Sequence, residues 1–352
     1  MKDGFIKAAS ASPVIKVADT EYNAQRVIET IKAADEMGVK MLVFPELVLT
    51  GCTCYDLTGH NVVLRGAKKA LLEVIAASEG VDMLVFVGLP IAVGSRLYSC
   101  AAAIYDGELL GLVPRENVRG TQFAEPTDSY VEVEIDAEHV AVLSTDYVFT
   151  CAALPDLKVA AELGADIDVL VPPSVRHAQA GATVIAQLAS FPETVTSADE
   201  AELTLRSQSR RLHCGMIMAA PGKGESTTDN VFSGLCMIAE NGEILAASEC
   251  ENSMAVTELD VEYIVNTRRG SDDFDLDSDE YYEAVWGGEP VETELTRSYR
   301  KYPHLPANEA DMPAYCERML DIQVSGLVKR RQYAGLGHCV VGISGGVDST
   351  LA

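Results

Sequence analysis

The chain lacks any hydrophobic run long enough to cross a membrane. Its longest apolar stretch, MLVFVGLPIAVG at residues 83–94, is far shorter than the roughly 20 residues that a transmembrane helix needs. The first residues, MKDGFIKAASASP, lack the apolar core of a secretory signal peptide. We therefore expect a cytoplasmic protein with no membrane partner.

Basic residues are also scarce. The sequence has 27 Lys and Arg residues against 53 Asp and Glu residues, a formal net charge of −26 at pH 7. No basic run is long enough to follow a phosphate backbone, so nucleic acid is excluded as a partner and the acidity is better explained by solubility. With 352 residues and 48% hydrophobic composition, the chain can form one large or two medium domains with a real core.

Metal and disulfide patterns are missing. The nine cysteines are scattered, with only Cys52 and Cys54 close together, and the six histidines do not cluster. This argues against a zinc site and a disulfide framework, and predicts reduced, mostly buried thiols. The acidic stretch DDFDLDSDE at 272–280 lacks EF-hand spacing, so a solvated face is preferred over a calcium site. Ser144 is not in a GxSxG motif, which argues against a serine hydrolase.

What the sequence does contain is an alternation of strand and helix patterns. Helical spacing or composition predicts helices at 20–38, 61–79, 154–163, 198–213 and 315–332. Apolar runs predict strands at 4–13, 41–47, 83–92, 98–106, 109–115, 139–146, 166–173, 215–222, 235–240, 243–249 and 339–343. The pair Asn241-Gly242 suits a type I′ hairpin turn. Because helices alternate with hairpins as well as single strands, we predict a mixed α/β fold, a four-layer α-β-β-α sandwich, over a barrel.

The character of the chain changes near residue 266. Residues 266–313 are acidic, aromatic and aperiodic, and we predict a linker there. The preceding 1–265 would form the first domain, and 314–352 would begin a second.

The second segment carries a motif that suits phosphate binding. SGGVDS follows the apolar run CVVGI, so successive backbone N–H groups and two hydroxyls can face a phosphate. The loop is not a Walker A motif and resembles the SGGxDS loop of ATP pyrophosphatases. The predicted ATP-binding residues are Ser344, Gly345, Gly346, Asp348 and Ser349.

Several motifs in order carry a wider resemblance. They are VFPELVLTG, GLVPR, STDYVF before LPDL, VPPS with AGAT, GKGESTTD, ENGEILAASE, IQVSGL and SGGVDS. On these motifs the chain resembles the amidase domain of bacterial glutamine-dependent NAD⁺ synthetases, in the nitrilase (carbon-nitrogen hydrolase) superfamily. The resemblance implies the nitrilase sandwich, and a chain that ends a few residues into a synthetase domain.

The resemblance also implies partners and cofactors. The amidase domain would hydrolyse glutamine to supply ammonia for amidating nicotinic acid adenine dinucleotide. It would need no cofactor of its own, whereas ATP and Mg²⁺ would serve the absent synthetase domain. The implied partners are that synthetase domain and further copies of the chain in a homo-oligomer, with glutamine bound only if the site is active.

Family members use a Glu-Lys-Cys triad, and only one member of it is present here. Glu46 in FPEL matches the general base. The lysine of the VPK motif is replaced by Arg115, which keeps the charge but cannot readily share a proton. An ungapped match from STDYVF to AGAT places Gly164 at the cysteine position, so no acyl-enzyme can form there.

The positions that frame glutamine in the family are altered too. Cys52 stands where the family has TGY, and QLASFPE replaces a small-residue Asn-x-Ser-x-Ser-Pro stretch. Gln187, Ala189 and Phe191 are the altered residues there, and we expect the Phe191 ring to intrude where substrate would lie. Cys151 is the nearest cysteine in sequence to Gly164, and a buried core position is the preferred interpretation for it.

Three hypotheses remain open from the sequence. The first is a degenerate glutaminase domain with a structural role. The second is an active amidase or glutaminase that uses an unforeseen nucleophile with Glu46, and the third is a small-ligand binding module. A thiol within about 4 Å of Glu46 would favour the second.

Overall fold

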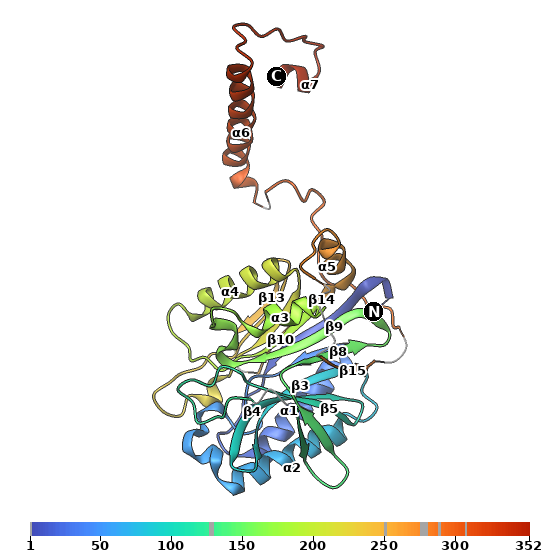
Figure 1. Ribbon diagram of the computed structural model, residues 1–352, viewed down its shortest axis with the longest axis vertical. Coiled ribbons are helices and arrows are strands. Elements are labelled where there is room, and N and C mark those ends of the chain that lie inside the picture. The colour runs from blue at the N-terminus through green and yellow to red at the C-terminus, as the bar shows by residue number, and fades with distance from the viewer. Residues whose placement is uncertain (1, 127–129, 250–251, 275–280, 288–289, 307) are drawn as a thin grey trace. The chain divides into compact units, whose positions relative to one another are not determined.

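Two β-sheets form the centre of the unit Met1–Arg297 (Figure 1). The computed structural model describes residues 2–126, 130–249, 252–274, 281–287, 290–306 and 308–352. The first sheet has the order β14-β1-β2-β3-β4-β5-β7-β6, and the second has the order β13-β12-β11-β10-β9-β8-β15. The strands of the first sheet are β1 (Phe5–Ser12), β2 (Met41–Val43), β3 (Leu84–Val93), β4 (Arg96–Tyr105), β5 (Glu108–Pro114), β6 (Val131–Glu134), β7 (Val140–Leu143) and β14 (Ser253–Asp260). Those of the second are β8 (Tyr147–Cys151), β9 (Leu154–Leu163), β10 (Val184–Leu188), β11 (Gly215–Ala219), β12 (Leu235–Glu240), β13 (Glu243–Glu249) and β15 (Tyr282–Trp286).

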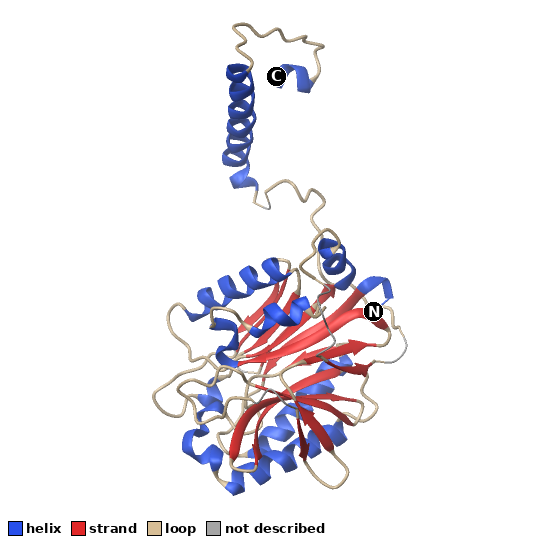
Figure 2. Cartoon of the chain, in the orientation of Figure 1, coloured by secondary structure: helices blue, strands red, loops and turns tan. Residues whose placement is uncertain are grey.

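Helices cover the outer face of each sheet (Figure 2). On the first sheet lie α1 (Thr20–Glu36) and α2 (Asn61–Ala77), and on the second α3 (Pro173–Gln179) and α4 (Ser197–Leu212). The buried faces of α1 and α2 join one core cluster, those of α3 and α4 another, and a third cluster fills the space between the sheets. The predicted α-β-β-α sandwich is confirmed.

Helical periodicity gave several elements correctly. In α1, Val27, Ile31 and Ala34 are buried, as the 3.6-residue spacing predicts, and the helix begins at Asp19, whose side chain accepts from the Tyr22 N–H. At the hairpin between β12 and β13, Asn241 and Gly242 have φ of 47° and 92°, which fits the predicted type I′ turn.

Three predicted elements are wrong. Residues 154–163 form strand β9 instead of a helix, since their strand is buried between helices and the inner core and so lacks the polar alternation that marks a half-exposed strand. Residues 166–173, predicted as a strand, contain the end of a 3₁₀ turn, η3 (Gly164–Asp168), and the start of α3. Residues 339–343 are not a strand, and none of the described strands pairs with them.

The first unit extends beyond the predicted boundary at residue 265. Helix α5 (Val261–Arg268) packs on it, and β15 pairs in parallel with β8, which buries Trp286 to 2% exposure. Arg297 closes the unit by an ion pair with Glu240 at 2.9 Å. The first half of the segment predicted as a linker is therefore part of the sandwich, although 275–280 and 288–289 lie outside the described residues.

The second unit, Ser298–Ala352, is described by itself. It contains α6 (Met312–Tyr333), which agrees with the predicted helix at 315–332, and the short α7 (Val347–Leu351). None of its described residues is buried. Within the described ranges, no helix of either unit has the length and apolarity needed to cross a bilayer.

Candidate active site

Glu46 lies just beyond the end of strand β2 and is held there by a close approach of two backbones. The loop that follows β2 passes over β3 at Gly88, where an added Cβ would lie 2.3 Å from the Leu47 nitrogen and 2.5 Å from the Pro45 oxygen. Only glycine fits such a contact. The Glu46 N–H donates to the Ala189 carbonyl at 3.1 Å, which ties this loop to the second sheet.

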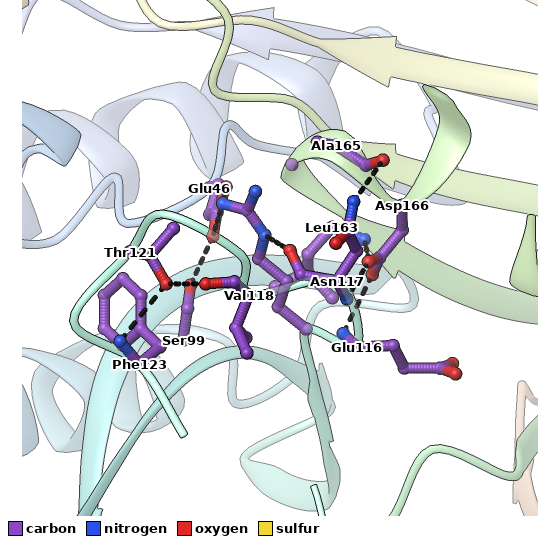
Figure 3. A network of polar contacts seen from close by, with 12 residues as sticks. Glu46, Ser99, Glu116, Asn117, Val118, Thr121, Phe123, Leu163, Ala165 and Asp166 are labelled. Carbon is purple, nitrogen blue, oxygen red and sulfur yellow. Dashed lines mark hydrogen bonds and ion pairs between the residues drawn. The ribbon is translucent and has the colours of Figure 1, made fainter. Parts of the chain in front are cut away.

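The Glu46 carboxylate is 1% exposed and has two side-chain partners. The Ser99 hydroxyl donates to Oε1 at 2.6 Å, and Arg115 Nη1 lies 3.3 Å from both oxygens (Figure 3). Arg115 is itself fixed, since its Nε donates to the Asn117 carbonyl at 2.8 Å. A buried carboxylate is costly unless paired, and the bonds from Ser99 and Arg115 offset part of that cost.

Gly164 meets this pair from the second sheet. It follows β9 as the first residue of η3, with φ of +53°, and its carbonyl accepts from Gln187 Nε2 at 2.9 Å. A Cβ added here would lie 2.5 Å from Glu46 Oε2 and 2.6 Å from both Cζ and Nη1 of Arg115. The three positions matched to the triad are thus brought together, and a side chain at the third would require the ends of the Glu46 and Arg115 side chains to move.

Asp166 joins the two loops that carry Arg115 and Gly164. Its carboxylate accepts from the backbone N–H groups of Leu163, Glu116 and Asn117 at 3.2, 3.2 and 2.6 Å (Figure 3). Burial raises the pKa of Asp166 to about 6, although these three donors favour the charged form. The Asp166 carboxylate therefore holds the backbone segments that carry Arg115 and Gly164 close together.

A cavity of about 400 Å³ opens beside Glu46 and Arg115. Its lining includes the polar residues Thr53, Asp56, Gln122 and Asn230 and the rings of Tyr55, Phe123 and Phe232. Cys52 also lines this cavity, so one thiol shares the pocket with Glu46.

The Cys52 thiol is disfavoured as a nucleophile. Burial, and the nearby carboxylates of Glu225 and Glu46, raise its pKa well above the ordinary value. Glu225 is 2% exposed and fixes the segment that carries Cys52, because it accepts from the N–H groups of Cys52 and Thr53 at 2.9 and 3.1 Å. A thiolate next to two carboxylates would be repelled.

The other altered positions divide into near and far. Gln187 and Ala189 contact the site through Gly164 and Glu46. Phe191 packs against the outer cluster of the second sheet and lines a different cavity of about 240 Å³, so its ring is not among the residues that line the cavity beside Glu46. Cys151 lies in the core between the sheets, away from that cavity.

Sequence reasoning missed residues that position the site. Gly88 and Ser99 sit within strands, where the only signals were a glycine inside an apolar run and a serine in SCAAAI. Glu225 and Asp166 carry no local signal, because their partners come from distant segments. Over the described parts of the chain, His, Cys, Asp and Glu side chains form no group of three that could hold a metal ion.

Comparison with known proteins places this geometry in a family. Residues 7–269 match the carbon-nitrogen hydrolase family. The chain belongs to the carbon-nitrogen hydrolases. Among its relatives, the glutamine-dependent NAD(+) synthetase of Mycobacterium tuberculosis is 32% identical over 99% of this chain and 54% of that protein. The enzyme of the same name from Thermotoga maritima is 24% identical over the whole chain and 57% of its own length.

Solved structures agree on the fold of this carbon-nitrogen hydrolase. A glutamine-dependent NAD(+) synthetase from Cytophaga hutchinsonii has a TM-score of 0.64 at 19% identity, covering 72% of this chain and 43% of that one. An amidase from Nesterenkonia sp. AN1, captured with an acetamide group on its active-site cysteine, has a TM-score of 0.58 at 15% identity, covering 77% of this chain and 96% of its own. The chain spans about half the length of the curated relatives it matches.

Proposed function

We propose that this chain is the glutaminase-type domain of an NAD⁺ synthetase-like protein and that it has lost the ability to hydrolyse glutamine. The matches along 99% of the chain to proteins named glutamine-dependent NAD(+) synthetases support the first part. The observation that carries the second part is the site of Gly164, where any Cβ would overlap Glu46 and Arg115.

In this proposal, the remaining side chains of the site do not supply the nucleophile that would attack the amide carbonyl. Amide hydrolysis through a covalent intermediate needs a nucleophile that attacks the carbonyl, a base that accepts its proton and a cation that stabilises the oxyanion. Glu46 is present as a base, but it is already bonded to Ser99 and Arg115. Arg115 offers a permanent charge without an exchangeable proton.

The domain would then act as a scaffold. It would hold the synthetase domain and further copies of the chain in a homo-oligomer, while the synthetase domain draws on free ammonia. ATP and Mg²⁺ would belong to that domain. The loop residues Ser344, Gly346 and Ser349, which we place at its start, are not buried here and bond mainly with each other. Because the described residues bury no part of this loop, we expect it not to hold ATP by itself.

A second candidate, an active amidase or a small-ligand module, rests on the cavity beside Glu46. Its volume is in the range of small-molecule sites, and Cys52 lies in it. The raised pKa of that thiol weighs against catalysis and leaves ligand binding as the stronger form of this alternative.

Ammonia release from glutamine tests the proposal. The purified chain is compared with Glu46→Ala, with ATP absent, and with any longer form of the protein. We expect that neither the purified chain nor a longer form of the protein releases ammonia faster than a heat-inactivated sample. Release that Glu46→Ala abolishes would show a working glutaminase.

A further inference from the structure

Three buried polar atoms without a hydrogen-bond partner lie behind Gly164. They are Glu162 Oε1, Gln187 Oε1 and Ser174 Oγ. Glu162 on β9 and Gln187 on β10 are register partners in parallel strands, which run about 4.8 Å apart. Because paired residues point to the same face, the two side chains are neighbours on the face that α3 and α4 cover.

Each side chain is already held at its other end. Glu162 Oε2 accepts from the Ser174 N–H at 3.1 Å, and Gln187 Nε2 donates to the Gly164 carbonyl at 2.9 Å. Turning the Gln187 amide over would place its oxygen against the Gly164 oxygen, so Oε1 keeps its present position. Gln187 Oε1 therefore has no donor in the protein interior, which is costly. The donors nearest to the Glu162 carboxyl are the N–H and the hydroxyl of Ser174, which favour its charged form but are outweighed by burial.

No cation among the described residues pairs with Glu162. The titratable groups that interact electrostatically with it are Asp166, Glu116 and Cys214. His177, on the same helix α3 as Ser174, is buried as well. Burial and the charge of Arg176 hold the pKa of His177 well below its ordinary value, so this imidazole is neutral. The Arg176 guanidinium forms an ion pair with Glu116 and so does not neutralise Glu162.

We propose that Glu162 is protonated at neutral pH and donates this proton to Gln187 Oε1, forming a Glu162–Gln187–Gly164 relay that positions η3 beside Glu46 and Arg115. One proton satisfies both acceptors at once. Glu162 and Gln187 are then positioning residues, and Gln187 serves the backbone of the site instead of a substrate. The relay exists whether or not the site retains chemistry.

The relay depends on pH. Burial, with the negative charges of Asp166 and Glu116, raises the pKa of Glu162 to about 8. Because this is above the value in the unfolded chain, near 4.5, the folded form binds the extra proton between these pH values. Stability from the relay is complete below about pH 4.5 and is lost as pH rises to about 8, where Gln187 loses its donor.

Infrared spectroscopy of the protonated carboxyl tests this directly. Glu162→Gln keeps the shape and supplies an amide donor, so the difference spectrum between wild type and this variant isolates the Glu162 band. We expect an acid C=O band at pH 6.5 that disappears with a midpoint near pH 8. In Gln187→Met, which removes the acceptor of the neutral acid, the midpoint falls.

Glu225→Gln is the matched control. Glu225 is about as buried as Glu162, but its oxygens accept from the backbone N–H groups of Cys52 and Thr53 and from the Thr53 hydroxyl. Burial raises the pKa of Glu225 too, although its three donors favour the charged form. Glu225→Gln should therefore leave the Glu162 band and its midpoint near pH 8 unchanged. Amide hydrogen exchange over residues 164–168, corrected for the intrinsic pH dependence, should accelerate at least tenfold above pH 8 in wild type and not in Glu162→Gln. Two results would overturn the proposal. One is a carboxylate band for Glu162 at pH 6.5, and the other is amide hydrogen exchange over residues 164–168 that has the same pH dependence in wild type and Glu162→Gln.

Discussion

At the scale of single residues, Glu46, Arg115 and Gly164 share one small space, so the size of the side chain at one position limits the size at the others. The Arg115 guanidinium occupies the space next to Gly164 that a side chain at this position would need. A cysteine restored there alone would overlap both members of the ion pair. Under the proposed function, the absence of a nucleophile at position 164 and the presence of arginine at position 115 would be coupled through volume as well as chemistry.

Gly164→Ala should destabilise the protein more than its backbone angle explains. Gly38→Ala is the control, since Gly38 also has a positive φ, +72°, but an added Cβ there meets nothing within 4 Å. The control should cost about 1–2 kcal/mol from left-handed backbone, and Gly164→Ala a further ~1–3 kcal/mol from overlap. Urea denaturation measures both.

Shortening the arginine should relieve the overlap. In a double-mutant cycle, Arg115→Lys with Gly164→Ala should show a favourable coupling of about 1 kcal/mol or more, because Cζ and Nη1 are removed. Equal losses for Gly164→Ala and Gly38→Ala, with no coupling, would mean that Arg115 does not occupy this space.

At the scale of elements, the site depends on the crossing of the 45–47 loop over β3. Gly88→Ala should lower the free energy of unfolding by about 2–4 kcal/mol, because the new Cβ would overlap the Leu47 nitrogen. Gly59→Ala is the control, with open space around it and no positive φ. A loss at Gly88 no larger than at Gly59, measured by urea denaturation, would show that the crossing is loose.

The elements also show how far the sequence could be interpreted. Helical periodicity located α1, α2 and α4 because each has one buried and one exposed face. The prediction for residues 154–163 was wrong for the opposite reason, because both faces of β9 are buried. Its residues 157, 159, 161 and 163 face the inner core, and helices cover its other face, so its sequence has no periodic signal. Its Ala, Glu and Leu residues then favoured a helix wrongly.

The site was predictable where a motif is local and was not where partners are distant. FPEL and VPR are contiguous, and the positions that they assign, Glu46 and Arg115, lie 3.3 Å apart. The placement of Gly164 against them came from spacing between flanking motifs. Ser99, Glu225 and Asp166 act through contacts across many tens of residues, which a single sequence does not encode as a pattern.

At the scale of the whole molecule, the two units differ in how well they are packed. The first has three core clusters, whereas the described residues of the second include none that are buried. Brief trypsin treatment should therefore cleave after the exposed Arg300 or Lys301 and leave a persistent fragment that contains the sandwich. Mass spectrometry that found early cleavage within β-strands of the first unit would contradict this division.

The central claim is that no nucleophile serves Glu46, and covalent trapping tests it most directly. The protein is incubated with a chloroketone analogue of glutamine, and its peptides are mapped by mass spectrometry, with Glu46→Ala in parallel. We predict no adduct on the peptides that contain Cys52 or Gly164. Among the cysteines of the described ranges, modification should be slow, independent of Glu46 and confined to the exposed Cys316 and Cys339. A rapid adduct on Cys52 that Glu46→Ala abolishes would mean that this domain has kept a working amidase centre with a relocated nucleophile.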